Sequence, residues 1–171
     1  MKVAILTISD RSARGEREDL SGPKIAKMIT DQGWSVDRQD VLPDDQEGIE
    51  SWLIETCETS EVDLILTTGG TGFSPRDQAP EATLAVVERQ APGLVEAMRS
   101  AGLKKTPHSM LSRAVAGIRG TTLIVNLPGS PRGAIENLEV IFPVLEHAIA
   151  LLGNDPEAEA GHHLMPKPRL T

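Results

Sequence analysis

Glycines and charged side chains are concentrated in one short stretch of the chain. Within nine positions it holds Gly69, Gly70, Gly72, Arg76 and Asp77. Glycines leave the backbone N–H groups of a turn uncovered, so such a turn can enclose an anion such as a phosphate. A tight turn between a strand and a helix is the alternative interpretation, but a bare turn seldom needs three glycines in four positions. We therefore expect residues 69–72 to bind a phosphate.

A second carboxylate, Asp44, follows an expected strand in a separate loop. Two carboxylates beside a phosphate-binding turn suit magnesium-assisted chemistry on a nucleotide, because Mg²⁺ prefers oxygen ligands and bridges phosphate oxygens. Arg76 would add a positive contact to the same ligand. Asp44 could instead cap the following helix, with Glu47 completing a capping box. Asp77 could instead form a turn ahead of Pro80.

Four further polar residues stand at the ends of expected strands or turns: Ser9, Asp10, Ser112 and Asn126. Each could contact a ligand, and each also has a structural interpretation. Ser9 and Asp10 could order their own loop. Ser112 could cap a turn, and Asn126 could cap the end of a strand. The residues by themselves leave both interpretations open.

Several well-known catalytic patterns are missing from the chain. It lacks the GxxxxGK[ST] spacing of P-loop proteins, and no GxGxxG follows its first strand. The single cysteine, Cys57, lies on an apolar helical face without a paired histidine, which favours a core role over a nucleophile. With one cysteine there is no clustered Cys/His spacing, so we set a zinc site aside.

Apolar runs predict the elements that must position these residues. Expected strands cover residues 2–8, 34–41, 62–68, 114–118 and 122–126. Expected helices cover residues 21–33, 49–57, 80–90, 92–104 and 135–152, and residues 12–19 are expected as a loop. The third strand is a nearly uninterrupted apolar run, which is typical of a strand buried on both faces of a parallel sheet, and the first strand is also expected to be buried. The last two have the spacing of a hairpin, so the sheet should be mixed, and the loops after the first three strands should share one edge.

Size and composition favour one globular domain. The 171 residues can bury a core, and we expect a domain over residues 1–153 and a tail over residues 154–171, where periodicity disappears. A net charge of −8 and an aromatic content of 2% argue against nucleic-acid binding. No apolar stretch approaches the roughly 20 residues that span a bilayer, so no membrane is expected. The lone cysteine and the missing signal-peptide pattern favour the cytoplasm.

Eight short motifs together resemble a known family. They are Ile8-Ser9-Asp10, Leu42-Pro43-Asp44, residues 67–72 (TTGGTG), Arg76-Asp77, residues 80–83 (PEAT), residues 111–113 (LSR), Ala116-Gly117 and residues 126–129 (NLPG). They occur in the order found in the MogA/MoaB molybdopterin-binding family, to which domains of gephyrin and of the plant molybdenum-insertion protein are related. The resemblance covers residues 3–152. GGTG alone is a weak signal, but this many ordered motifs is highly specific.

The resemblance implies a three-layer α/β/α sandwich with a mostly parallel, mixed central sheet. It also implies transfer of AMP from Mg-ATP to molybdopterin, which gives adenylyl-molybdopterin and pyrophosphate. Asp44 and Asp77 correspond to the family's two essential acids and would position Mg²⁺ and the nucleotide. The substrate-binding positions that it implies are Ser9, Asp10, Gly69, Gly70, Thr71, Gly72, Arg76, Ser112, Asn126, Pro128, Gly129 and Ser130.

The resemblance further implies a homotrimer or hexamer and a molybdenum-insertion protein as a partner. Two other functions compete with adenylyl transfer. A protein of the MoaB type would bind molybdopterin as a scaffold without catalysis. A nucleotide pyrophosphatase resembling the amino-terminal domain of CinA would share the fold and the GGTG loop. The LSR and NLPGSP segments favour adenylyl transfer over the pyrophosphatase.

Overall fold

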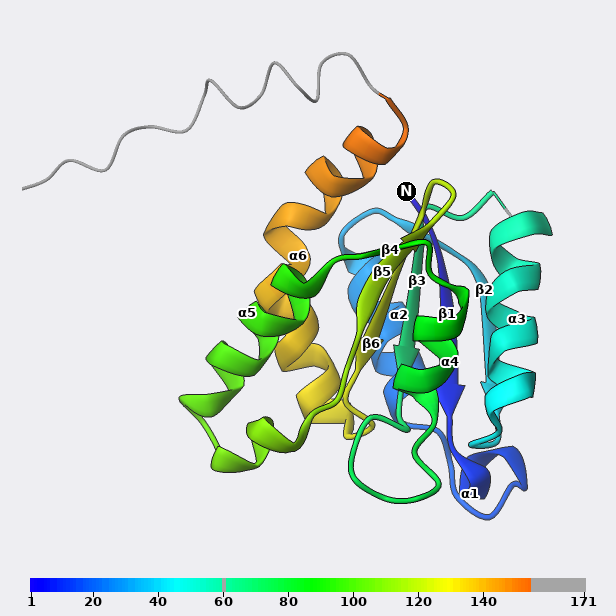
Figure 1. Ribbon diagram of the computed structural model, residues 1–171, viewed down its shortest axis with the longest axis vertical. Helices are drawn as coiled ribbons and strands as arrows, with labels where there is room; N and C mark the ends of the chain where they lie inside the picture. Colours follow the sequence, from blue (N-terminus) through cyan, green and yellow to red (C-terminus); the bar gives the residue numbers. More distant parts are fainter. Residues whose placement is uncertain (60, 155–171) are drawn as a thin grey trace, which may run out of the picture.

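The computed structural model of the chain describes residues 1–59 and 61–154, and a six-stranded sheet forms its centre (Figure 1). The strands are β1 (Lys2–Ile8), β2 (Ser35–Leu42), β3 (Leu64–Thr68), β4 (Arg89–Gln90), β5 (Ala116–Arg119) and β6 (Thr122–Leu127). Their order across the sheet is β2-β1-β3-β6-β5-β4. β1, β2, β3 and β6 are parallel, whereas β5 runs antiparallel to β6 and to β4. The mixed sheet and its hairpin confirm the prediction from the sequence.

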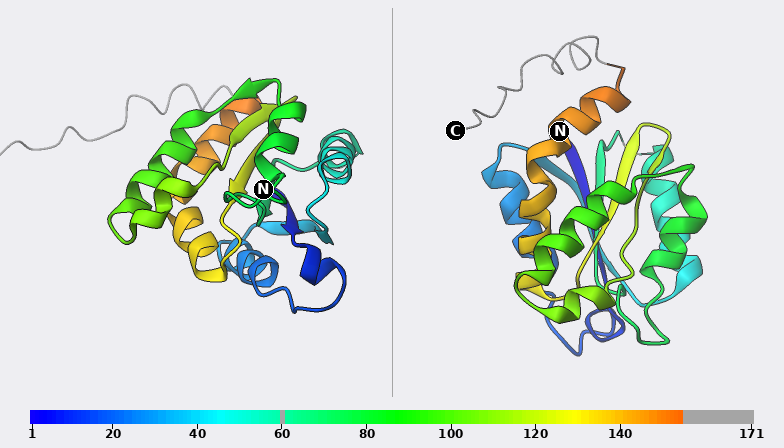
Figure 2. Two further views of the ribbon diagram at one scale, coloured as in Figure 1. Left: turned by 60° about the horizontal axis from the view of Figure 1, so that its bottom comes forward. Right: turned by 60° about the vertical axis from the view of Figure 1, so that its left-hand side comes forward.

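Helices cover both faces of the sheet (Figures 1 and 2). They are α1 (Asp10–Ala13), α2 (Ser21–Asp31), α3 (Gln46–Thr59), α4 (Ala79–Val86), α5 (Pro92–Leu103), α6 (Pro131–Leu152) and the 3₁₀ helix η1 (Pro107–Leu111). Successive residues of a strand point to opposite faces. Val3 and Ile5 therefore pack into the core shared with α2, α5 and α6. Ala4 and Leu6 pack into the core shared with α3 and α4, which confirms the three-layer α/β/α sandwich.

Two elements differ from the expectation. α1 occupies the start of the expected loop, residues 12–19, because Ser9 caps it. α4 ends at Val86, before residue 90, because the chain then pairs with β5 as β4. The expected tail, residues 154–171, lies outside the described residues apart from its first residue. In the described part of the chain no helix is both long and apolar enough to cross a bilayer.

The carboxyl ends of β1, β2, β3 and β6 meet at one edge of the sheet. The strand order reverses at β1, because β2 lies on one side of it and β3 on the other. In open α/β sheets ligands bind outside the carboxyl ends of the strands at such a reversal. The loops after β1, β2 and β3 therefore converge where the sequence predicts chemistry.

Candidate functional site

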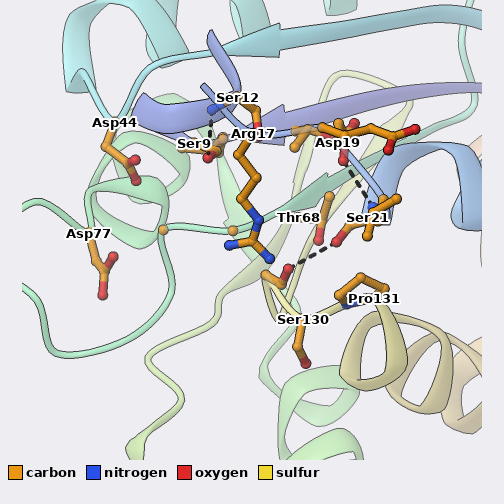
Figure 3. Close-up of a pocket in the computed structure, with 17 residues that line it drawn as sticks. Ser9, Ser12, Arg17, Asp19, Ser21, Asp44, Thr68, Asp77, Ser130 and Pro131 are labelled. Carbon is orange, nitrogen blue, oxygen red and sulfur yellow. Dashed lines mark hydrogen bonds between the residues drawn. The ribbon is translucent and has the colours of Figure 1, made fainter. Parts of the chain in front are cut away.

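A cavity of about 350 Å³, called here the first cavity, opens at this edge of the sheet (Figure 3). Its walls come from the loops after β1, β2 and β3, the start of α2 and the turn after β6. Seven of the predicted site residues line it: Ser9, Asp44, Gly69, Gly70, Asp77, Gly129 and Ser130. The structure thus brings both predicted acids and the first two glycines to one cavity.

The glycine loop, residues 69–72, has a backbone that side chains would obstruct. Gly69 and Gly70 have φ angles of 103° and 62°, in the left-handed region that favours glycine. A methyl group on Gly69 would collide with the carbonyl oxygen of Ile8 at the end of β1. A methyl group on Gly129 would lie 3.1 Å from the Gly69 Cα. Close packing of three chain segments therefore accounts for part of the glycine content.

The glycine loop is anchored through its carbonyl oxygens. The Gly70 oxygen accepts a hydrogen bond from the Ala79 amide at 3.1 Å, and the Thr71 oxygen accepts one from the Arg113 amide at 3.0 Å. The Gly72 oxygen accepts a third bond from Arg113 Nε at 2.6 Å. Within the described residues, no protein group accepts a hydrogen bond from the amides of residues 70–72. These amides are therefore available to an anion.

Asp44 and Asp77 both lie against the glycine loop. A methyl group on Gly70 would lie 3.0 Å from Asp44 Oδ1, and one on Gly72 would lie 2.8 Å from Asp77 Oδ2. Figure 3 shows the two side chains on the same side of the first cavity. Carboxylates from two separate loops are thus brought to the same glycine loop.

Asp44 is held by an exchange of hydrogen bonds with Asp10. The Asp10 amide donates to Asp44 Oδ2 at 3.0 Å, and the Asp44 amide donates to Asp10 Oδ1 at 3.1 Å. Asp45 caps α3 instead, because its Oδ2 accepts from the Gly48 amide at 2.9 Å, so the capping interpretation of Asp44 is wrong. Burial raises the pKa of Asp44 above its ordinary value, and the charges of Asp10 and Asp77 raise it further.

Asp77 forms part of a turn, and it also lines the first cavity. Its Oδ2 accepts a hydrogen bond from the Ser74 amide at 3.0 Å, and its own amide donates to the Ser74 carbonyl at 2.9 Å. Its carbonyl accepts from Arg113 Nη2 at 2.7 Å. The turn interpretation is therefore confirmed, and the side chain lines the first cavity as well.

Two arginines near the first cavity differ in what they contact. Arg76 makes a two-point contact with Asp10, from Nε to Oδ2 at 3.0 Å and from Nη2 to Oδ1 at 2.8 Å, and does not line the cavity. This contact lowers the pKa of Asp10. Arg17, which is not among the predicted site residues, lines the cavity and points into it in Figure 3. Its polar, aperiodic segment gives no sequence signal for the direction of a side chain.

A second cavity, of about 290 Å³, contains most of the remaining predicted positions. It is lined by Thr71, Gly72, Ser112, Pro128 and Ser130, together with residues of α5, η1 and α6. Ser130 lines both cavities, and the glycine loop contributes its first two residues to one and its last two to the other. The predicted site is thus divided between two neighbouring cavities.

Asn126 lines neither of these cavities. It is fully buried, and its Nδ2 donates to Thr67 Oγ1 at 2.9 Å and to Thr83 Oγ1 at 2.8 Å. Its Oδ1 accepts from the Val115 amide at 3.0 Å. The structure therefore gives Asn126 a bracing role between β6, β3 and α4, in place of the predicted contact with substrate.

Three residues outside the predicted set shape the first cavity. Asp19 lies just before Leu20, the N-cap of α2, and its Oδ1 accepts from the amides of Ser21 and Gly22 at 2.9 and 3.1 Å. An acid directly before an expected helix is a signal that the sequence contains. Ser21 Oγ donates to the Gly129 carbonyl at 2.9 Å, and Thr68 Oγ1 donates to the Pro128 carbonyl at 2.7 Å. These two bonds fix the turn after β6 beside the glycine loop.

The donor set fits a magnesium ion that arrives with a ligand. Among the described residues, no group of three or more Asp, Glu, His or Cys side chains could hold a metal ion alone. Asp44 and Asp77 nevertheless offer the hard carboxylate oxygens that Mg²⁺ prefers, and Mg²⁺ is commonly bound by one or two carboxylates together with substrate phosphates.

The sequence also defines the family. Residues 4–147 match the family described as "Probable molybdopterin binding domain", and the chain belongs to this family. It is 41% identical over 155 residues to the molybdopterin adenylyltransferase of Helicobacter pylori (strain J99), which covers 89% of this chain and 88% of that protein. It is 42% identical over 166 residues to gephyrin of Dictyostelium discoideum, which covers 91% of this chain but only 23% of gephyrin. The solved structure of the molybdopterin biosynthesis enzyme MoaB from Thermus thermophilus matches with a TM-score of 0.85 at 48% identity, over 91% of this chain and 98% of that one.

Proposed function

We propose that the protein is a molybdopterin adenylyltransferase, which transfers AMP from ATP to molybdopterin. The relative from Helicobacter pylori that carries this name matches over most of both chains. The structural observation that carries the proposal is the position of Asp44 and Asp77, which come from separate loops and lie against one glycine loop. Such a site suits the joining of two phosphate-bearing ligands.

In the proposed reaction, an oxygen of the terminal phosphate of molybdopterin attacks the α-phosphorus of ATP. A new P–O bond forms, the bond from the α-phosphorus to the bridging oxygen breaks, and pyrophosphate leaves with that electron pair. No general base is needed, because a phosphate monoester is already largely ionised at neutral pH. The protein's task is therefore to bring two anions together and to offset their repulsion.

Each part of the first cavity has a role in this task. Asp44 and Asp77 would hold Mg²⁺, which on binding neutralises charge on the phosphate oxygens. The amides of residues 70–72 would donate hydrogen bonds to a phosphate. Asp10 keeps Asp44 in place through its amide and carboxylate, and Arg76 secures Asp10 in turn.

The two cavities would receive different substrates. We assign the nucleotide phosphates to the first cavity, which contains the two acids. We assign the pterin to the second cavity, where Thr71, Ser112 and Pro128 form part of the wall. The reacting phosphates would then meet near Ser130, which lines both cavities.

Incubation with molybdopterin and Mg-ATP, followed by mass spectrometry of the pterin, tests the proposal. Asp44→Ala and Asp77→Ala should each lower turnover by about 10²–10³-fold, the range for removing one preorganised group that stabilises charge in the transition state. Asp45→Asn is the matched control, because Asp45 caps α3 beside Asp44 and asparagine caps equally well. This control should keep its activity.

The same assay separates the competing functions. Full turnover by both alanine variants would overturn the proposed mechanism. Tight binding of molybdopterin without magnesium-dependent release of pyrophosphate would indicate a binding protein of the MoaB type. Cleavage of nucleotides that does not require molybdopterin would indicate a pyrophosphatase of the CinA type.

We also propose that the active form is a homotrimer or hexamer, and that it works in the cytoplasm, where ATP is available. The product would pass to a molybdenum-insertion protein. The family resemblance supports these proposals. Large apolar side chains that remain exposed on the single chain, including Phe73 and Met110, are consistent with further contacts between copies.

A further inference from the structure

The charges that line the first cavity are unbalanced. Four carboxylate side chains line it: those of Glu18, Asp19, Asp44 and Asp77. Arg17 is the only cationic side chain among the described residues that line the cavity. A ligand with phosphate groups would add further negative charge at short range, where repulsion between like charges is strongest. A positive side chain in the cavity wall would offset this repulsion.

Arg17 lines the cavity and remains available for this contact. Arg14, in the same segment, is paired with Glu16 at 2.7 Å, and Arg76 is paired with Asp10 at 2.8 Å. None of the ion pairs in the described part of the chain involves Arg17. Figure 3 shows its side chain extending from the loop after α1 into the cavity.

The segment that carries Arg17 is anchored near the cavity. On its carboxyl side, Asp19 accepts hydrogen bonds from the amides of Ser21 and Gly22 at 2.9 and 3.1 Å, and from Thr7 Oγ1 at 2.7 Å. On its amino side, Ser9 caps α1. Arg17 therefore extends from a fixed position, and a guanidinium can donate two parallel hydrogen bonds to one phosphate.

We infer that Arg17 binds a substrate phosphate in the first cavity and takes the role that the sequence assigned to Arg76. The inference rests on the proposed function for the identity of the ligand, which is a phosphate group of either ATP or molybdopterin. A solvated surface arginine is the ordinary alternative for an exposed side chain. Its place in the wall of an otherwise acidic cavity favours the binding role.

Three variants test the inference. Arg17→Ala removes the charge, and Arg17→Lys keeps the charge but loses the two-point geometry. Arg11→Ala is the matched control, because Arg11 is an exposed arginine of α1 in the same part of the chain and does not line the cavity. The Tm of each variant should equal that of the wild type, since both side chains are exposed.

Binding and turnover are then measured separately. Isothermal titration with ATP and with pyrophosphate, each with magnesium chloride, gives affinity without the reaction, and steady-state assays give KM for ATP and for molybdopterin. Arg17→Ala should weaken the affinity for ATP or pyrophosphate, or raise the KM for ATP or molybdopterin, by about 10–100-fold. This is the range for a charge-assisted contact. Arg17→Lys should recover part of the loss, and Arg11→Ala should show none. A raised KM for ATP or for molybdopterin identifies which phosphate is bound.

The outcomes distinguish the inference from the proposed function. If wild-type protein makes adenylyl-molybdopterin and Arg17→Ala has unchanged KM values and affinities, the inference is overturned and the function stands. If wild-type protein makes no adenylated product but Arg17→Ala binds ATP or pyrophosphate more weakly than Arg11→Ala, the phosphate contact stands and the function is overturned. Equal losses in Arg17→Ala and Arg11→Ala would also overturn the inference, because they would show a general effect of charge.

Discussion

Two carboxylates beside the first cavity lie in opposite electrostatic environments. Asp44 is partly buried and faces two other acids, and burial is the main reason that its pKa is raised. Asp10 accepts a two-point contact from Arg76, whose hydrogen bonds are the main reason that its pKa is lowered. The charged form is therefore disfavoured at Asp44 and favoured at Asp10. This contrast has opposite consequences for stability.

Asp44→Asn should stabilise the protein at pH 7. Folding raises the pKa of the Asp44 carboxyl above its ordinary value of 3.8. The carboxyl therefore destabilises the folded state at pH values above 3.8, and this penalty disappears at pH values below 3.8. Asparagine keeps an oxygen that can accept from the Asp10 amide. We expect a higher Tm than wild type at pH 7 and a difference that shrinks as the pH falls toward 3.8. A lower Tm for Asp44→Asn at pH 7 would contradict the assigned environment.

Asp10→Asn should change stability in the opposite direction. Folding lowers the pKa of the Asp10 carboxyl. The carboxyl therefore stabilises the folded state at pH values above its ordinary pKa, and this contribution is lost as the pH falls through the lowered pKa. We expect a lower Tm than wild type at pH 7 and a smaller deficit in acid. Thermal unfolding followed by circular dichroism at several pH values measures both variants together. Parallel shifts in the two variants would show that a shared loop movement, rather than charge, is responsible.

Elements around the glycine loop are joined by one side chain, Arg113. It donates to the carbonyl oxygens of Gly72 and Asp77 and to the carboxylate of Glu81 in α4. Its own amide donates to the Thr71 carbonyl. The loop after β3 and the start of α4 are thus attached to the segment that leads into β5.

Arg113→Ala should lower the free energy of unfolding by about 1–3 kcal/mol, because three acceptors lose a charged donor. Arg113→Lys should restore little, since an ammonium group cannot reach all three acceptors in the same geometry. Lys27→Ala is the control, because Lys27 forms an exposed pair with Asp31 within α2, and such pairs contribute less than about 1 kcal/mol. Urea unfolding of the three variants measures the difference. Equal effects in Arg113→Ala and Lys27→Ala would show that Arg113 does not brace the loop.

The sequence predicts the elements with local signals and misses those that depend on distant partners. Local signals are the apolar runs of β1 and β3 and the hairpin spacing of β5 and β6. They are enough to predict the mixed sheet and the edge at which the candidate site lies. β4 exists only because two residues pair with β5. Asn126 is buried because Thr67 and Thr83, from two other elements, accept its hydrogen bonds. Arg17 was missed because nothing in its segment indicates where the side chain points.

At the scale of the whole molecule, the long helix α6 presents apolar residues to solvent. Val140, Val144 and Leu151 are 37%, 49% and 39% exposed. Their spacing places them on one side of the helix, because residues 4 and 11 positions apart lie close together around its axis. A row of exposed apolar side chains is a surface that a second copy can cover.

Val144→Glu should therefore reduce the mass of the proposed homotrimer or hexamer in solution. A charge in the centre of this row would have to be buried without a partner, which is unfavourable. Leu84→Glu is the matched control, because Leu84 is 45% exposed on α4, on the opposite face of the sheet. Light scattering on a sizing column should give a lower mass for Val144→Glu only. An unchanged mass for Val144→Glu would place the interface elsewhere on the chain.

The sharing of Ser130 between two cavities has a consequence for the fate of the product. Each substrate would occupy a single cavity, whereas adenylyl-molybdopterin would span both through one covalent linkage. A ligand held at two linked sites dissociates more slowly than either half alone, because the released half rebinds before the other leaves. Pyrophosphate, which has no such second attachment, would escape first. The enzyme would then retain its reactive product until an acceptor arrives, and the activated pterin would be protected from hydrolysis in transit.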